Sequence, residues 1–509
     1  MNHSASLNAA QRATALERLA SGGELDMLVV GGGITGAGVA LDAASRGLSV
    51  ALLEAHDLAH GTSRWSSKLI HGGLRYLRHL QVGVAWESAR ERHILMTRTA
   101  QHLVRPMPFL AVLDDSLRPV GGVLTELGVR VGDVLRIASG TRGGQLPGPR
   151  RISAHEARRL VPALRREGLR GAILFWDGQL EDDAHLVVTV ARTAAAHGAD
   201  IVTHCAVDAI ADGQVRATDR LTGRSFTVRA RTVVNATGVW ADLIDPAVRL
   251  RPSKGAHLVL DSAALGDPRA AIIVPVAGES ARWVGATPTG DGRVIVGLTD
   301  EEHHGPIEDE PTVTAAEEHF LLSTVATAFD HPLGPECVIG RYAGYRPLLD
   351  SGTGSTADIS RRHAIIASQD GRLVTLVGGK LTTYRRMAQD LVDRVVGDHG
   401  PRCRTASIPL VGAAPRAQLR GIDAPPRLVA RYGTEAPEVA ALAAADPSLL
   451  QPVFDGTPVL GVELLFGLRH EGALDVDDLL DRRVRLGLVS AERLRAQPLA
   501  DALLAAVPV

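Results

Sequence analysis

MLVVGGGITGAGVALDAASRGLSVALLE, residues 27–54, is the stretch of sequence that decides the fold. The apolar run 27–30 has the length of a strand and leads into three consecutive glycines. Small and apolar side chains then recur at helical spacing as far as Ala44, and a second apolar run ends at Glu54. We interpret the stretch as a strand–helix–strand unit, which is typical of an α/β fold.

Three glycines of this unit, Gly31, Gly33 and Gly36, have the G-x-G-x-x-G spacing of a dinucleotide-binding turn. The first glycine makes the turn, the second lets a pyrophosphate approach the backbone, and the third packs the helix on the strand. Glu54 ends the second strand, where a carboxylate can bond the ribose hydroxyls. A glycine-rich turn alone is also a common structural junction, but the strands and the acid around this one favour dinucleotide binding.

Two later segments repeat the pattern of a strand that ends in small residues. One is the β-branched run before Ala236 and Gly238. The other is the run 373–377, which leads to Gly379 and to Lys380 at the start of a helical pattern. A small-residue turn lets a ligand approach the backbone, and a helix N-terminus attracts an anionic group. We expect both strands to join the first sheet, so that the core is assembled from distant segments.

The chain is longer than one hydrophobic core usually organises, at 509 residues. The short runs 272–276, 281–286 and 293–298 are separated by turn residues and predict antiparallel strands. After Pro409 the sequence becomes rich in alanine, leucine and arginine with helical periodicity. We therefore predict an α/β protein with a Rossmann-like core of discontinuous segments, an interleaved antiparallel β-sheet substrate domain and a helical C-terminal domain. The predicted boundaries are 1–23 for an N-terminal extension, 24–414 for the core, about 100–170 and 251–345 for the interleaved substrate domain within it, and 415–509 for the helical domain.

Composition excludes several classes of protein. The 55 basic and 57 acidic residues give a formal net charge of -2, so no overall field favours nucleic acid and we predict no nucleic-acid partner. Cys205, Cys337 and Cys403 have no disulfide or metal-ligand spacing, which indicates a reducing cytosol. Charged residues interrupt the N-terminus, and the apolar runs fall short of the roughly 18 residues of a spanning helix. We expect a cytoplasmic protein without a secretory signal.

Three motifs together resemble the FAD-dependent glycerol-3-phosphate dehydrogenases. They are GGGITGAG at 31–38, GTSRWSSKLIHGGLRYL at 61–77 and GGKLTTYR at 378–385. The last two are much narrower markers than the first, which is shared by many flavoproteins. The resemblance runs from about Glu24 to the C-terminus, where 481–487 is similar to the small helical domain of the family. Arg64 and Trp65 depart from the serine and basic residue that are more usual in the second motif.

The resemblance implies FAD as the cofactor, bound without a covalent link. A long polar loop directly after the second strand suits a flavin better than a diffusible nicotinamide cofactor, because its donors can hold a pyrophosphate and tune the isoalloxazine. The residues expected to bind the cofactor are Gly31, Gly33, Gly36, Glu54, Thr62, Ser63, Ser66, Ser67, Lys68, His71, Gly72, Gly73, Val207, Ala236, Gly238, Gly379, Lys380, Leu381 and Thr382.

The resemblance also implies oxidation of sn-glycerol 3-phosphate to dihydroxyacetone phosphate, with a hydride moving from C2 to flavin N5. A dianionic phosphate needs converging cations. The implied substrate-binding residues are Arg75, Tyr76, Arg361 and Lys380. The C2 hydroxyl must lose a proton, and the implied base is His257, because histidine is the usual base near neutral pH. Arg346 could instead polarise the hydroxyl, and the choice between the two is open.

The electron acceptor is also open. The family implies a membrane quinone and peripheral attachment to the inner face of the cytoplasmic membrane, for which 118–136 is a candidate surface. An oxygen-using oxidase on the same scaffold is the main alternative, and an FAD-binding protein without catalysis is another. The cations named above disfavour an amine oxidase, whose substrate needs a carboxylate clamp. A homodimer is left open.

The cluster DEEHH at 300–304 is the one run of candidate metal ligands that draws attention. It lacks ligand spacing, so we expect a solvated acidic turn there and predict no metal.

Overall fold

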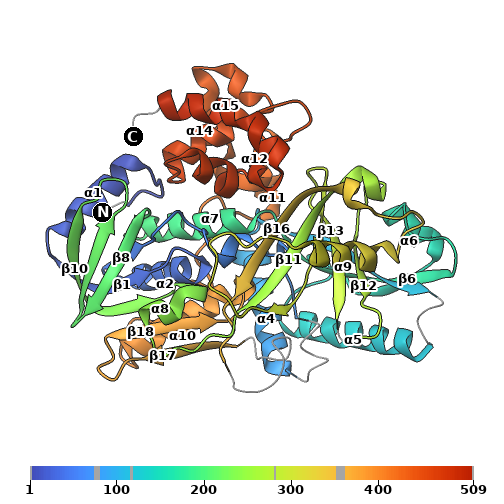
Figure 1. Ribbon diagram of the computed structural model, residues 1–509, viewed down its shortest axis with the longest axis horizontal. Coiled ribbons are helices and arrows are strands. Elements are labelled where there is room, and N and C mark those ends of the chain that lie inside the picture. The colour runs from blue at the N-terminus through green and yellow to red at the C-terminus, as the bar shows by residue number, and fades with distance from the viewer. Residues whose placement is uncertain (1–2, 74–80, 115–118, 280–281, 351–361, 507–509) are drawn as a thin grey trace.

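The computed structural model describes residues 3–73, 81–114, 119–279, 282–350 and 362–506 (Figure 1). Among them, two sheets lie side by side, and a group of helices packs against both.

The first sheet holds the nucleotide-binding core. Its central strand β1 pairs in parallel with β10 on one side and with β2 on the other, and β10 pairs in parallel with β18. The strands in sheet order are β17 (His363–Ala367), β18 (Leu373–Gly378), β10 (Ser225–Asn235), β1 (Glu24–Val30), β2 (Val50–Leu53) and β7 (Asp200–Val202). Outside this order, β9 (Gln214–Asp219) pairs with β10, and β8 (Cys205–Ala211) pairs with β9. The prediction that distant segments build one core is confirmed.

Helices cover both faces of this sheet, which explains why its strands are continuous apolar runs. On one face α2 (Ile34–Ser45) packs against α7 (Asp183–Ala196) and α10 (Tyr384–Val396). On the other face lies α1 (Ala9–Ala20), from the predicted N-terminal extension. Arg12 of α1 is buried and pairs with Asp219, so this segment is packed into the core.

The second sheet is mainly antiparallel, apart from the parallel pair β12 and β4. Its strands in order are β15 (Glu301–Glu302), β11 (Ser253–Asp261), β14 (Arg293–Gly297), β13 (Trp283–Pro288), β12 (Ala271–Pro275), β4 (Val104–Asp114), β6 (Leu169–Leu180) and β3 (Leu69–Ile70), with β16 (Val338–Arg346) paired to β11 and β5 (Arg150–Ile152) paired to β6. The associated helices are α4 (Val82–Ile94), α5 (Pro119–Ala138), α6 (Ala154–Leu160) and α9 (Ala315–Ala326). Because β3 lies in the polar loop, that loop is tied to the second sheet.

The C-terminal region is helical and sits above both sheets in Figure 1, in red. Its main elements are α11 (Arg416–Leu419), α12 (Pro426–Tyr432), α13 (Ala436–Ala441), α14 (Gly461–His470) and α15 (Ser490–Ala506), with the short helical segments η10 (Asp478–Arg483) and η11 (Leu486–Leu488) between the last two. Two apolar clusters of its own, around Leu464 and Phe466, hold it together. Among the described residues of the whole chain, none of the helices is both long and apolar enough to span a bilayer.

Candidate active site

A cavity of about 1330 Å³ lies between the two sheets. Val30 and Gly31 from the first sheet line it on one side, and His257 and Ile295 from the second sheet line it on the other. The polar loop that joins the sheets contributes Thr62 to Ser67 with the exception of Arg64. A cavity of this kind at the ends of parallel strands is the usual ligand site of an α/β sheet.

The turn between β1 and α2 brings the backbone to the cavity wall. Gly31 has φ +108°, and a Cβ there would lie 2.6 Å from the carbonyl oxygen of Ala236. Gly36 does not line the cavity, and a Cβ at this position would collide with the carbonyl oxygen of Gly31. Ser63 Oγ accepts a hydrogen bond of 2.9 Å from the Ile34 backbone N–H at the start of α2. Ser63 therefore caps the start of α2, and both lie in the cavity wall.

Glu54 follows the end of β2 and lies beside this turn. Its carboxylate accepts backbone hydrogen bonds from Gly32 at 2.5 Å and from His56 at 2.8 Å. Burial raises the pKa of Glu54, and the two backbone donors oppose that shift. The side chain lines the cavity beside Val207 and so offers its oxygens to a ribose there.

These residues fit a dinucleotide. The glycine turn admits a pyrophosphate against the backbone, the α2 N-terminus faces it, and Glu54 can bond a ribose. The predicted cofactor residues that line the cavity are Gly31, Gly33, Glu54, Thr62, Ser63, Ser66, Ser67, His71, Val207, Ala236, Gly238, Gly379, Lys380, Leu381 and Thr382. Those that do not line it are Gly36, Lys68, Gly72 and Gly73. Lys68 is instead buried in an ion pair with Asp183 at 2.6 Å.

His257 on β11 is almost fully buried, with 1% exposure. Its Nε2 lies 2.8 Å from Ser67 Oγ, and its ring stacks on Tyr342 with centroids 4.7 Å apart. Burial, and then the charges of Arg346 and Lys68, lower the pKa of His257 to about 3. The imidazole is therefore neutral at physiological pH.

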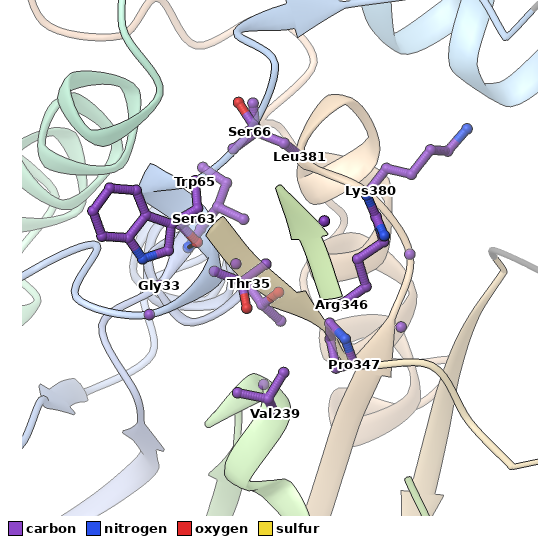
Figure 2. Close-up of a pocket in the computed structure, with 18 of the residues that line it drawn as sticks. Gly33, Thr35, Ser63, Trp65, Ser66, Val239, Arg346, Pro347, Lys380 and Leu381 are labelled. Carbon is purple, nitrogen blue, oxygen red and sulfur yellow. Dashed lines mark hydrogen bonds between the residues drawn. The ribbon is translucent and has the colours of Figure 1, made fainter. Parts of the chain in front are cut away.

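Arg346 ends β16 and enters the cavity beside β11, as Figure 2 shows. Its Nη1 lies 3.1 Å from Ser253 Oγ and 3.2 Å from Asp300 Oδ1, and a Cβ at Gly255 would collide with the guanidinium. The expectation of a solvated acidic turn is wrong for Asp300, whose side chain is only 5% exposed. It lies three residues after the end of β14, where it lines the cavity and pairs with Arg346.

Lys380 follows Gly379 and precedes the short helical segment η6 (Leu381–Thr383), which leads into α10. Its side chain extends away from Leu381 in Figure 2, and Nζ donates to Ser88 Oγ on α4. The structure thus brings His257, Arg346 and Lys380 to one cavity. Arg75, Tyr76 and Arg361 lie outside the described residues.

Sequence reasoning missed several polar groups at this site. Asp177 is buried in the cavity wall, where it accepts from the Gly72 N–H and pairs with Arg92. Asp183 begins α7 and pairs with Lys68. The run of acids at 181–183 was a visible helix-start signal, but nothing local indicated its partners.

The fold and the cavity define an FAD-dependent oxidoreductase, and the comparisons with known proteins agree. Residues 26–385 match the family described as FAD dependent oxidoreductase, and residues 403–506 match the C-terminal domain of alpha-glycerophosphate oxidase. The chain is 51% identical over 505 residues to Glycerol-3-phosphate dehydrogenase 1 of Mycobacterium tuberculosis (strain ATCC 25618 / H37Rv), covering 97% of this chain and 98% of that one. The chain belongs to the family of glycerol-3-phosphate dehydrogenases.

Solved structures show the same fold. The glycerol-3-phosphate dehydrogenase from Bacillus halodurans complexed with FAD is 26% identical, with a TM-score of 0.74, and covers 97% of this chain and 94% of its own. L-alpha-glycerophosphate oxidase from Mycoplasma pneumoniae is 18% identical with a TM-score of 0.57, covers 76% of this chain and 98% of its own, and shares the fold alone.

Proposed function

We propose that the protein oxidises sn-glycerol 3-phosphate to dihydroxyacetone phosphate and passes the electrons to a membrane quinone. FAD, when bound, supplies the acceptor for the C2 hydride. The observation that carries the proposal is that Arg346, Lys380 and His257 line the same cavity as the glycine turn and the polar loop. The relative named Glycerol-3-phosphate dehydrogenase 1, at 51% identity, supports the choice of substrate.

His257 and Arg346 are proposed to act at the C2 hydroxyl. The guanidinium of Arg346 stabilises the oxyanion that develops as the hydroxyl loses its proton. The neutral ring of His257 accepts that proton. Burial is the main cause of the low pKa of His257, and the charges of Arg346 and Lys68 lower it further; a dianionic phosphate bound nearby opposes the contribution of those two charges.

Lys380 is proposed to bind the substrate phosphate together with Arg75 and Arg361, the two cations outside the described residues. The support is chemical, because a dianion needs several donors and these cations come from separate segments. Tyr76, also outside the described residues, is proposed to line the same subsite.

The cavity wall supports a quinone as the acceptor. Phe109 and Phe175 stack with ring centroids 5.4 Å apart and line the cavity with Ile273. Val129, on one face of α5, lines it as well. An apolar wall of this kind suits a lipid-soluble ring more than it suits a phosphate.

The opposite face of α5 supports peripheral attachment to the membrane. Val131, Val134 and Ile137 are 43%, 63% and 60% exposed, and Trp86 of α4 is 38% exposed. A neighbouring groove of about 580 Å³ is lined by Trp86 and by a set of positively charged residues, and none of the described residues that line it is acidic. The positively charged residues are Arg90, Arg98 and Arg142. Exposed apolar side chains next to unopposed cations are typical of a surface that lies on anionic lipid.

Anaerobic mixing tests the proposal. Purified protein loaded with FAD is expected to lose its flavin absorbance with glycerol 3-phosphate and to regain it faster with a quinone than with oxygen. Glycerol should reduce the flavin far more slowly. Faster reoxidation by oxygen would make the protein an oxidase, and no reduction by glycerol 3-phosphate would overturn the substrate.

Two variants separate binding from chemistry. Lys380→Met should raise KM for glycerol 3-phosphate and reduce its preference over glycerol, because phosphate contacts persist from ground state to transition state. Arg346→Gln should lower the reduction rate by about 10²–10³-fold. Arg216→Gln, an exposed substitution on β9, is the control and should change neither quantity.

A further inference from the structure

The segment Ser66–Ser67–Lys68 lies against His257 in a conformation that needs support from elsewhere. Ser67 Oγ is 2.8 Å from His257 Nε2. Lys68 has φ +53°, a left-handed value that is uncommon for a residue with a side chain. Such a conformation persists where the surroundings fix it.

Asp183, the first residue of α7, fixes both ends of this segment. Its Oδ2 accepts from the Ser66 backbone N–H at 2.9 Å and from Ser66 Oγ at 2.8 Å. Its Oδ1 accepts from Lys68 Nζ at 2.6 Å. Asp183 is fully buried and Lys68 is 4% exposed, so the two charges are compensated mainly by each other. Ser67 is held between two residues bound to one carboxylate.

The C-terminal region supports the same carboxylate. Arg485, between η10 and η11, is 4% exposed, and its Nη2 lies 3.7 Å from Asp183 Oδ1. The same Nη2 donates to the backbone carbonyl of Arg64 at 2.5 Å. Arg485 therefore binds the backbone of the polar loop just before Ser66 and adds a second positive charge beside Asp183.

Tyr342, on β16 of the second sheet, contacts both this segment and His257. Its hydroxyl donates to the Ser66 carbonyl at 2.9 Å, and its ring stacks on His257. With Nε2 of His257 beside Ser67, Nδ1 is the buried ring nitrogen that has no hydrogen-bond partner among the described residues. For Nδ1 to accept a proton, Nε2 must carry hydrogen and donate to Ser67 Oγ.

We propose that Asp183 is a positioning residue for the oxidation: it holds Ser66 and Lys68 so that the Ser67 hydroxyl accepts from His257 Nε2, and Arg485 of the C-terminal region keeps Asp183 in place. The inference rests on the proposed role of His257 in the reaction. It assigns the helical region a part in the active site, although among the described residues none from that region lines the cavity.

A double-mutant cycle tests the proposal. Asp183→Asn should slow anaerobic flavin reduction by about 10- to 100-fold, the size of a lost charged hydrogen bond, and change KM little. Ser67→Ala should slow it similarly. In the Ser67→Ala background, Asp183→Asn should add less than about twofold, because residues that act through one another are not additive. Full additivity would mean a merely structural role and would overturn the proposal.

A structural readout makes the test independent of turnover. In crystal structures of the FAD-loaded proteins, the distance from Ser67 Oγ to His257 Nε2 should be within hydrogen-bond range in the wild type and exceed it in Asp183→Asn, and an unchanged contact would overturn the proposal. Asp42→Asn is the matched control, because Asp42 is equally buried and pairs with Arg46 away from the loop. It should leave the reduction rate unchanged.

Two further outcomes are informative. If Asp183→Asn does not fold, Arg485→Gln takes its place, with the same direction expected and a smaller effect. If His257→Gln does not slow reduction, the proposed role of His257 fails, and the crystallographic distance alone decides whether Asp183 positions Ser67.

Discussion

At the scale of single residues, Gly33 shows how a missing methyl group keeps the cofactor site open. A Cβ at this position would lie 3.1 Å from Ser63 Oγ, the group that receives the first N–H of α2. A larger side chain must either displace Ser63 or enter the space of the pyrophosphate. We expect Gly33→Leu protein to be purified without flavin, as measured by absorbance per protein after gel filtration. Gly23→Ala is the control, because a Cβ there meets nothing within 4 Å. A yellow Gly33→Leu protein would contradict this account.

The buried position of His257 predicts how the free energy of unfolding depends on pH. Burial lowers its pKa from 6.5 to about 3, whereas in the unfolded chain it titrates near 6.5. Between these values the unfolded chain binds the extra proton, so the native state loses stability as the pH falls below 6.5. Between pH 7 and 5 wild-type protein should lose about 2 kcal/mol more unfolding free energy than His257→Gln protein, as measured by urea denaturation. Parallel losses in the two proteins would show that His257 titrates normally.

The same residue gives a kinetic expectation. His257→Gln should slow anaerobic flavin reduction by roughly 10²–10⁴-fold if it accepts the proton. In the wild-type enzyme kcat/KM should show no histidine inflection between pH 5 and 8, because the free enzyme has this ring neutral throughout that range. An inflection near 6.5 that is absent in the variant would contradict the buried position of the ring.

At the scale of elements, the sequence predicts what is local and misses what is distant. The unit β1–α2–β2 was predictable because its glycines and apolar runs lie within one stretch of chain. The antiparallel pairing of β12 with β13 and of β13 with β14 was predictable for the same reason, because turn residues separate strands that are neighbours in the sequence. The ion pair of Lys68 with Asp183 joins residues 115 positions apart, and no periodicity encodes it. The prediction for Asp300 was wrong because its acidic neighbours suggested a solvated turn, whereas the chain after β14 brings its carboxylate against Arg346.

The segment η10 gives a prediction at this scale, because two of its arginines bind Asp57, which lies between β2 and the polar loop. Arg483 binds both oxygens of Asp57 at 2.7 and 2.8 Å, and Arg482 Nε binds Oδ2 at 2.7 Å. Asp57 is fully buried, so Asp57→Asn takes from Arg483 the carboxylate that it pairs with, and takes from Arg482 one of its two carboxylate partners, the other being Asp478. We expect it to lower the free energy of unfolding by about 3–5 kcal/mol, as measured by denaturant titration of the FAD-loaded protein. Glu318→Gln, which removes the exposed pair with Arg341, should cost less than about 1 kcal/mol. Equal costs would contradict the structural importance of η10.

At the scale of the whole molecule, α5 lies between the cavity and the surface proposed to bind the membrane. One of its faces lines the cavity through Val129, and the other exposes Val131, Val134 and Ile137. In Figure 1 the helix runs along the lower edge of the second sheet, on the side away from the C-terminal helices. A membrane bound at this face would therefore lie one helix away from the cavity, while the C-terminal region remains in water. This geometry supports electron transfer to a lipid-soluble acceptor.

The last prediction tests that orientation. Val134→Ser combined with Ile137→Ser should weaken binding to anionic phospholipid vesicles by about tenfold or more, because each side chain loses roughly 1 kcal/mol of apolar transfer energy. Cosedimentation with vesicles measures the effect, and added salt should weaken wild-type binding further by screening Arg90, Arg98 and Arg142. The control replaces Leu221 and Leu494 by serine, since these are 50% and 68% exposed on other parts of the surface. Loss of binding in the control alone would place the membrane elsewhere, and wild-type protein that stays in solution would favour a soluble route to the acceptor.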